Sequence, residues 1–141
     1  MEERIDKNSV NIPDEIMEKW QNTVDIMAEL INVPAALIMK AGPEYLEVIR
    51  SSRSNSNPYH TGENTPRNGL YCDTVINKKE KLLVPNALKS KKWKDNPDIE
   101  LGMISYLGFP ILWPDQEPFG TLCVLDTVEN AFSQETERLM Q

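Results

Sequence analysis

The sequence contains few of the residues that usually build metal centres or reactive thiol sites. Among 141 residues there are two cysteines, Cys72 and Cys123, and one histidine, His60. They form no CxxC motif and no cysteine–histidine cluster, so we expect no zinc or iron–sulfur site. Both cysteines lie among apolar residues, which favours two buried, reduced thiols; a disulfide between them is the alternative. His60 lies in a segment rich in serine and asparagine, and we expect it to be an incidental loop residue.

Long apolar runs are also missing. No run approaches the ~18–20 residues that a helix needs to cross a bilayer. Residues 1–7 lack the apolar stretch of a signal peptide. We therefore expect no membrane insertion of this segment and a cytoplasmic location.

Basic residues are fewer than acidic ones, 15 lysines and arginines against 22 aspartates and glutamates, which gives a formal net charge of −7. A nucleic-acid-binding surface needs a basic face, so nucleic acid is not an expected partner. The sequence contains neither a glycine-rich phosphate loop of the Walker type nor the spacing of an EF-hand. We therefore predict no metal site.

An amphipathic helix is predicted after a polar lead-in at residues 1–12, which we expect to be flexible. Pro13 suits the first position of a helix, and Asn32 and Pro34 are typical of its end. Apolar residues recur at three- and four-residue steps, which predicts one apolar stripe. Its main members are Ile16, Trp20, Val24, Met27 and Ile31.

The remaining pattern predicts an α+β domain over residues 13–141. We expect a hairpin from strands 35–40 and 45–50, a long loop at 51–68, a short helix at 70–77 and a strand at 81–85. A polar crossover with a short helix follows, and two apolar runs at 106–113 and 119–125 flank a proline-bounded turn. Ser133 and Thr136 have capping-box spacing, which predicts a helix that ends with the chain at Gln141. We infer that this C-terminal helix is truncated, and that the chain is a piece of a longer protein.

The order of these elements resembles a GAF domain, a sensory module found in many signalling proteins. The local matches have the family's spacing. They are Leu70-Tyr71-Cys72-Asp73-Thr74-Val75-Ile76, Leu82-Leu83-Val84-Pro85-Asn86-Ala87, Gly108-Phe109-Pro110-Ile111, Phe119-Gly120-Thr121-Leu122-Cys123-Val124-Leu125-Asp126 and Phe132-Ser133-Gln134-Glu135. The combination is most similar to GAF domains of bacterial sensor histidine kinases and diguanylate cyclases.

The resemblance implies a GAF-like (profilin-like) fold with a central antiparallel sheet. The N- and C-terminal helices would cover one face, and short helices and loops the other. A ligand would lie between the sheet and those loops, under the 70–76 helix and the 86–103 crossover. Aromatic walls with a few hydroxyls suit a small-molecule pocket. The candidate ligand-binding residues are Tyr71, Cys72, Trp93, Ser105, Tyr106, Thr121 and Cys123.

The function implied is regulatory, and the domain itself is not expected to be an enzyme. A local group of lysines favours an anionic ligand. Its members are Lys78, Lys79, Lys81, Lys89, Lys91, Lys92 and Lys94. Bilin attachment is not expected, because the attachment cysteine of photoreceptor GAF domains is usually followed by histidine and Cys72 is followed by Asp73. The motif of cyclic-nucleotide GAF domains is not recognisable.

Two alternatives remain. The first is a homodimerisation module without a ligand, in which part of the apolar stripe from Ile16 to Ile31 packs against a second copy. The second is a thiol-dependent free methionine sulfoxide reductase, with Cys72 and Cys123 as nucleophile and resolving cysteine. The reductase family normally has more cysteines in its loop region, and residues 55–68 contain none.

Overall fold

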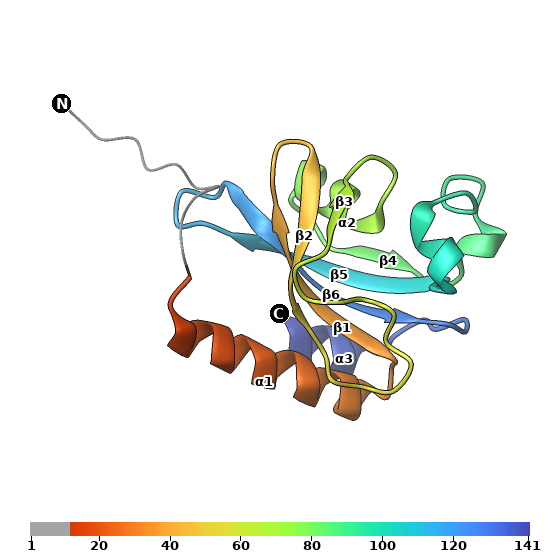
Figure 1. The fold of residues 1–141 in the computed structure, drawn as a ribbon. Coiled ribbons are helices and arrows are strands. Elements are labelled where there is room, and N and C mark those ends of the chain that lie inside the picture. The colour runs from red at the N-terminus through yellow and green to blue at the C-terminus, as the bar shows by residue number, and fades with distance from the viewer. Residues whose placement is uncertain (1–11) are drawn as a thin grey trace.

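The computed structural model describes residues 12–141, which form one antiparallel sheet with helices on both faces (Figure 1). The predicted lead-in lies outside the described residues except for Ile12, whose side chain packs partly buried against the core. Within the described residues, the strand order is β3-β2-β1-β6-β5-β4. The strands are β1 (Ala35–Ala41), β2 (Tyr45–Ser51), β3 (Asn64–Pro66), β4 (Leu82–Val84), β5 (Ser105–Leu112) and β6 (Pro118–Asp126).

The two predicted hairpins are confirmed, and they meet at the centre of the sheet. β1 pairs antiparallel with both β2 and β6, so that Leu37 lies opposite Cys123 and Ile38 opposite Leu122. β5 pairs with β6 along its length. The central strands are therefore β1 and β6, although more than 70 residues separate them in sequence.

Strand β3 is the one that the sequence did not predict, since residues 51–68 were expected to form only a loop. Three residues of β3 pair with the start of β2, from Tyr45 to Glu47. Asn64, Thr65 and Pro66 show no apolar alternation, and proline is confined to the edges of sheets. The strand exists because the β2 edge offers it backbone partners, which local sequence cannot reveal.

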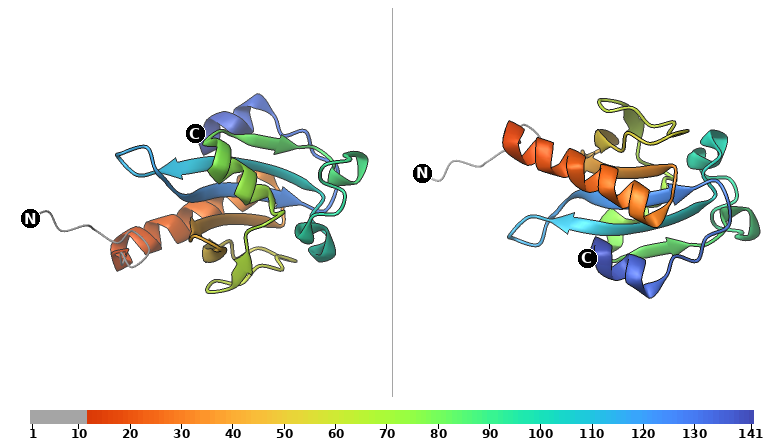
Figure 2. Two further views of the ribbon diagram at one scale, coloured as in Figure 1. Left: turned by 90° about the horizontal axis from the view of Figure 1, so that it is seen from above. Right: turned by 90° about the horizontal axis from the view of Figure 1, so that it is seen from below.

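Side chains that alternate along the central strands form two separate cores. Ala36, Ile38 and Val124 face α1 (Asp14–Ile31) and α3 (Gln134–Met140). Leu37, Met39 and Cys123 face α2 (Tyr71–Lys78) and the crossover. The crossover contains the short 3-10 helices η2 (Ala87–Lys89) and η3 (Pro97–Leu101). The predicted layers are thus confirmed, with the terminal helices on one face and the short elements on the other (Figure 2).

The first helix begins and ends where the sequence indicates. Pro13 occupies the N-cap position, and Asn32 ends the helix in the left-handed conformation with φ of 60°. Val24 and Met27 are buried against the sheet of the same molecule. These two members of the predicted stripe are therefore covered by the domain's own sheet, and Trp20 and Ile31 are partly buried against the same core. The large apolar side chains of α1 that are exposed are Ile16, Ile26 and Leu30.

The C-terminal helix has the predicted N-cap. The Ser133 hydroxyl accepts a hydrogen bond from the Thr136 backbone N–H at 3.1 Å. Met140 is buried in the same core as Val24, so α3 is attached to the face that α1 covers. None of the helices within residues 12–141 is long and apolar enough to cross a membrane.

Candidate functional site

Six of the seven predicted ligand-site residues converge beneath α2 and the crossover. Tyr71 and Cys72 come from α2, Trp93 from the crossover, Tyr106 from β5, and Thr121 and Cys123 from β6. All six side chains are buried, and all but Thr121 belong to one apolar cluster. We call these six residues the α2-face cluster.

Three aromatic rings fill the middle of the α2-face cluster. The rings of Tyr71 and Tyr106 are stacked with centroids 4.8 Å apart, and Trp93 packs against Tyr71 at 5.2 Å. The Tyr71 hydroxyl donates to the Met103 carbonyl at 3.1 Å, which ties α2 to the end of the crossover. Burial raises the pKa of Tyr71 to about 12, so this hydroxyl keeps its proton.

The two thiols lie next to each other beside the rings. Cys72 Sγ is 3.9 Å from Cys123 Sγ, and the Thr121 hydroxyl donates to Cys72 Sγ at 3.2 Å. The Tyr106 hydroxyl is also 3.2 Å from Cys72 Sγ. The predicted burial of both free thiols is confirmed.

The neighbours of the two thiols push their pKa values in opposite directions. The Cys123 thiol and the two hydroxyls can donate hydrogen bonds to the Cys72 sulfur, and this lowers the pKa of Cys72 despite its burial. Burial raises the pKa of Cys123 well above its ordinary value. Burial likewise raises the pKa of Tyr106.

Three residues that the sequence did not single out close the site. Asn96 donates from Nδ2 to the Trp93 carbonyl at 2.7 Å, and its Oδ1 accepts from the Asp98 backbone N–H at 2.9 Å. Tyr59, from the loop between β2 and β3, donates from its hydroxyl to Asp98 Oδ1 at 2.8 Å. The turn signal in Asn96-Pro97-Asp98 and the lone aromatic Tyr59 in a polar loop were the available signals. Neither indicates that the two segments meet.

The Tyr59–Asp98 pair is held in a poorly hydrated environment. Burial raises the pKa of the Asp98 carboxyl, although the hydroxyl of Tyr59 partly opposes this effect. Burial, and then the charge of Asp98, raise the pKa of Tyr59. The hydrogen bond therefore links the long loop to the crossover through a neutral phenol and a carboxyl whose ionisation is unfavourable.

Ser105 is not part of the α2-face cluster. It lies at the start of β5, and its hydroxyl donates to the Val128 carbonyl at 2.8 Å and the Asp126 carbonyl at 3.4 Å. Along β5 the side chains alternate, with Tyr106 in the α2-face core and Leu107 in the opposite core. Ser105 is two residues before Leu107, so the two side chains lie on the same face of the sheet. The Ser105 hydroxyl therefore faces away from the predicted site.

The lysine group does not form one basic surface. Lys78, Lys79 and Lys81 precede β4, whereas Lys89, Lys91, Lys92 and Lys94 follow it. Three of these lysines pair with glutamates, and Lys92 lies over the Trp93 ring at 5.1 Å. The pairs are Lys79–Glu117 at 4.0 Å, Lys81–Glu137 at 2.9 Å and Lys89–Glu129 at 3.1 Å.

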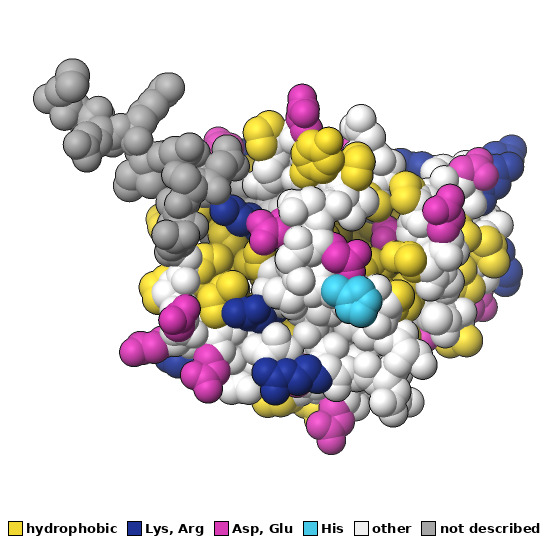
Figure 3. All heavy atoms as spheres, in the orientation of Figure 1, with side chains coloured by type: hydrophobic (Ala, Val, Ile, Leu, Met, Phe, Trp, Pro, Cys, Tyr) yellow, Lys and Arg dark blue, Asp and Glu magenta, His cyan; other side chains and the backbone are white. Residues whose placement is uncertain are grey.

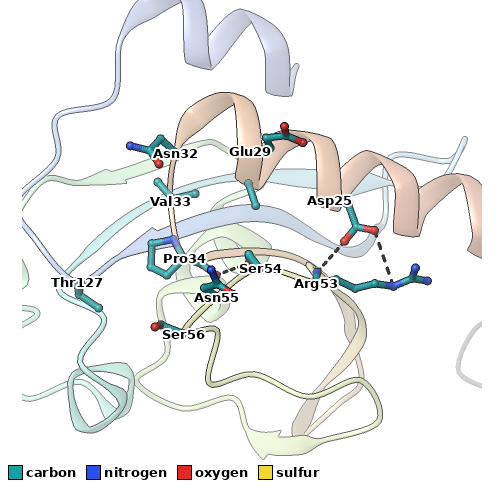
Figure 4. A pocket seen from close by; sticks show the side chains of 11 residues that line it. Asp25, Glu29, Asn32, Val33, Pro34, Arg53, Ser54, Asn55, Ser56 and Thr127 are labelled. Carbon is teal, nitrogen blue, oxygen red and sulfur yellow. Dashed lines mark hydrogen bonds and ion pairs between the residues drawn. The ribbon is translucent and has the colours of Figure 1, made fainter.

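One surface hollow lies away from the α2-face cluster. It measures about 690 Å³ and opens between the end of α1 and residues 53–56, where Asp25 accepts the Arg53 backbone N–H at 2.7 Å (Figure 4). Its lining is mainly polar. The six cluster residues do not line this hollow, and their own side chains are packed together under α2 and the crossover.

Other candidate chemistry is sparse in the part of the chain that the structure describes. No group of three or more metal-ligating side chains occurs within residues 12–141. His60 is exposed on the loop surface, with an acidic side chain beside it (Figure 3).

The comparison with protein families decides the classification. The model of the GAF domain matches residues 16–141. The chain belongs to the GAF domain family. The predicted resemblance is thereby confirmed at the level of the family and the fold. No curated protein sequence matches it significantly.

Solved GAF domains share the fold at low sequence identity. The GAF domain of an Acinetobacter phosphoenolpyruvate-protein phosphotransferase is 18% identical with a TM-score of 0.70, covering 94% of this chain and 77% of that one. The type II free methionine-R-sulfoxide reductase of Thermoplasma acidophilum is 13% identical with a TM-score of 0.71, covering 90% and 85%. The blue-light-absorbing PixJ GAF domain of Thermosynechococcus elongatus is 12% identical with a TM-score of 0.72, covering 91% and 82%. These relatives include both sensors and enzymes.

Proposed function

We propose that this GAF domain is a cytoplasmic sensory domain of a bacterial signalling protein, which binds a small molecule in the space now filled by the α2-face cluster. The observation that supports this most is the contrast between the two faces of the sheet. One face carries the two terminal helices, whereas the other has aromatic, hydroxyl and thiol groups beneath short helices and turns. Buried polar groups under an irregular cover are typical of ligand sites.

Ligand entry requires the crossover to move. The ring of Trp93, on the crossover, lies against Tyr71 of α2. The hydrogen bond from Asn96 to the Trp93 carbonyl lies within the crossover, and the Tyr59–Asp98 hydrogen bond joins the crossover to the β2–β3 loop. These contacts involve side chains and a turn, so they can break without disturbing the ladders of the sheet. A ligand that prefers the opened crossover would shift the population towards it.

The central strands provide the mechanical link to the terminal helices. Cys123 faces the α2-face cluster, and the next residue, Val124, packs in the core beneath α1 and α3. On β1, Leu37 likewise faces the α2-face cluster, and the next residue, Ile38, packs in the core beneath α1 and α3. A shift of these strands therefore changes the packing on both faces, and α1 and α3 are the elements through which the domain would act on a histidine kinase or diguanylate cyclase output domain.

Relatives of the same fold support a small-molecule role without defining the ligand. One solved relative is a phycocyanobilin-bound GAF domain from a cyanobacterial phytochrome, 16% identical with a TM-score of 0.69. Another is the free methionine-R-sulfoxide reductase of Neisseria meningitidis in complex with its substrate, 15% identical with a TM-score of 0.70. We propose binding without catalysis for this domain, because residues 55–68 contain none of the additional loop cysteines that the reductase family normally has.

Native mass spectrometry of the purified domain, compared with the denatured sample, tests the proposal. We expect a mass excess that disappears on denaturation, and a matching ligand from a panel of small aromatic and anionic metabolites. Lys91, Lys92 and Lys94 lie on the exposed turn around Trp93, so anionic ligands should be tested first. At one hundred times its Kd, the ligand should raise the free energy of unfolding by about 2.7 kcal/mol.

Trp93→Ala should reduce that stabilisation, whereas Leu88→Ala should retain it. Leu88 lies on the same crossover but is exposed, so its truncation is a matched control. A domain that carries no extra mass and is stabilised by no member of the panel would contradict the binding proposal.

A second candidate function is homodimerisation, and one observation favours it. Ile16, Ile26 and Leu30 expose 40%, 53% and 66% of their surface on one side of α1. Their angular positions on a helix with 3.6 residues per turn lie within a quarter turn. This apolar edge shares Ile16 with the predicted stripe, whereas Val24 and Met27 of the stripe are buried against the sheet.

A further inference from the structure

Two cysteines that are 51 residues apart in sequence lie with their sulfur atoms in contact. Cys72 Sγ and Cys123 Sγ are separated by 3.9 Å, one on α2 and the other on β6. A disulfide has a sulfur–sulfur distance of about 2.05 Å, so the thiols need to approach by about 2 Å. Cys72 lies in the first turn of a short cover helix. A small shift of that helix towards the sheet would supply this movement.

The surroundings of the two sulfurs differ in a way that assigns different roles to them. The hydroxyls of Thr121 and Tyr106 lie 3.2 Å from Cys72 Sγ. Hydrogen bonds to sulfur favour the thiolate, and the Cys123 thiol, followed by these two hydroxyls, lowers the pKa of Cys72 despite its burial. Cys123 is fully buried and burial raises its pKa, so it retains its proton. Cys72 is 7% exposed and is the thiol that a small oxidant reaches first.

We propose that Cys72 and Cys123 are a peroxide-sensitive thiol pair that forms a reversible disulfide between α2 and β6. The proposal stands on the sulfur geometry and does not depend on the ligand-binding function. The oxidant is a hydroperoxide, with hydrogen peroxide as the simplest member of the class.

The peroxide oxidises the two thiols in two steps. The Cys72 thiolate attacks one peroxide oxygen, the O–O bond breaks, and Cys72 becomes a sulfenic acid while hydroxide leaves and is protonated to water. Cys123 then attacks the Cys72 sulfur, the S–O bond breaks, and the oxygen leaves as water with the proton of Cys123. The two sulfurs together lose two electrons, which reduce the peroxide. A dithiol such as dithiothreitol reverses the change.

Disulfide formation would attach the cover helix to the central strand. Cys123 pairs with Leu37 and Gly108 across the sheet, so β6 is held in place by both neighbours. Helix α2 is therefore the element that moves. Oxidation would thereby restrict the cover of the α2-face cluster.

Peptide mapping of the folded, full chain after peroxide treatment tests this inference. We expect a Cys72–Cys123 cross-linked peptide, lighter by two hydrogen atoms than its parts, which disappears on treatment with dithiothreitol. In Cys123→Ser, we expect a sulfenic acid at Cys72 that a dimedone probe traps. In Cys72→Ser, we expect Cys123 to stay reduced under the same conditions.

Thr121→Val provides a kinetic test with little change in shape. Removing one hydroxyl donor from the thiolate should slow the oxidation about tenfold, because the loss of this hydrogen bond raises the pKa of Cys72 and lowers the fraction of thiolate. Thr23→Val is the control and should leave the rate unchanged, because Thr23 is an exposed residue of α1. Two free thiols after treatment of the folded wild-type chain would overturn the proposal, and so would a sulfinic acid at Cys72 without the cross-link.

Discussion

At the scale of single residues, two glycines let neighbouring groups approach closely. A Cβ at Gly120 would lie 1.7 Å from the Met39 carbonyl oxygen on the paired strand β1. A Cβ at Gly108 would lie 2.1 Å from the Tyr106 hydroxyl, which is the group beside Cys72. The first clash involves the backbone of β1, and the second involves the buried ring of Tyr106, which is stacked on Tyr71. Neither position can accept a methyl group without a shift of its neighbours.

Gly120→Ala should destabilise the domain by about 3 kcal/mol or more, because the central strands β1 and β6 must separate to fit the methyl group. Urea unfolding followed by circular dichroism measures the change. Gly62→Ala is the control, since nothing lies within 4 Å of a Cβ there and the cost is the left-handed conformation alone, about 1 kcal/mol. Equal effects of the two substitutions would contradict the close approach at Gly120.

Asp98→Asn should change how stability depends on pH. Because burial raises the pKa of Asp98 in the folded state, folding is most favoured while this carboxyl is protonated. That contribution is complete below the unfolded pKa of about 3.9 and is lost as pH rises through the folded pKa. The variant cannot ionise, and its amide oxygen can still accept from Tyr59.

The free energy of unfolding of Asp98→Asn minus that of the wild type should therefore rise with pH above about 4. Urea titrations between pH 4 and pH 8 measure the difference. Glu100→Gln, at an exposed position two residues away, is the control for removing one carboxyl. A difference that is flat or falls with pH would show that the buried carboxyl is not the cause.

At the scale of elements, one guanidinium group joins three parts of the α2 side of the molecule. Arg67 follows β3 and donates from Nε to Asp73 Oδ1 at 2.6 Å, from Nη1 to the Gly42 carbonyl at 2.8 Å and from Nη2 to Asn77 Oδ1 at 3.0 Å. Asp73 and Asn77 lie on α2, and Gly42 lies in the β1–β2 turn. These bonds position the cover helix over one end of the sheet.

Arg67→Lys should cost about 1–3 kcal/mol, because a single ammonium group cannot reach three acceptors in these directions. The loss should be largest in amide hydrogen exchange of α2, which measures the local opening of that helix. Arg53→Lys is the control, since the Arg53 side chain is exposed and its Nε is 3.9 Å from Asp25. We expect a change within about 0.5 kcal/mol there.

At the scale of the whole molecule, the two faces of the sheet differ in what they leave uncovered. The α2 face closes over its own aromatic rings. The α1 face leaves Ile26 and Leu30 exposed about one helical turn apart. Self-association is therefore expected to use α1.

Sedimentation velocity should show a species of twice the 16.1 kDa monomer mass for the wild type. Ile26→Glu with Leu30→Glu should give monomers, because charged side chains would have to be buried in the interface. Leu88→Glu, at an exposed apolar position on the crossover, is the control and should leave the association unchanged. A monomeric wild type would contradict the proposal that this chain forms a homodimer by itself.

The sequence by itself determined the order and type of most elements. The apolar spacing of 16–31 predicts α1, the apolar runs around Pro114 and Pro118 predict β5 and β6, and Ser133 predicts the start of α3. These signals are local, because hydrophobic period, caps and turns act within a few residues. The same local pattern, compared with known sequences, was sufficient to predict the GAF fold and six residues of the α2-face cluster.

Only the tertiary structure decided which side chains meet. It placed Cys72 against Cys123, paired Tyr59 with Asp98, added β3 to the sheet edge, and turned Ser105 to the opposite face. It also placed Val24 and Met27 against the sheet of the same molecule. Contacts between distant segments depend on strand register and on how the cover elements pack, and a shift of one residue in register moves every side chain to the other face. No local pattern in the sequence specifies them.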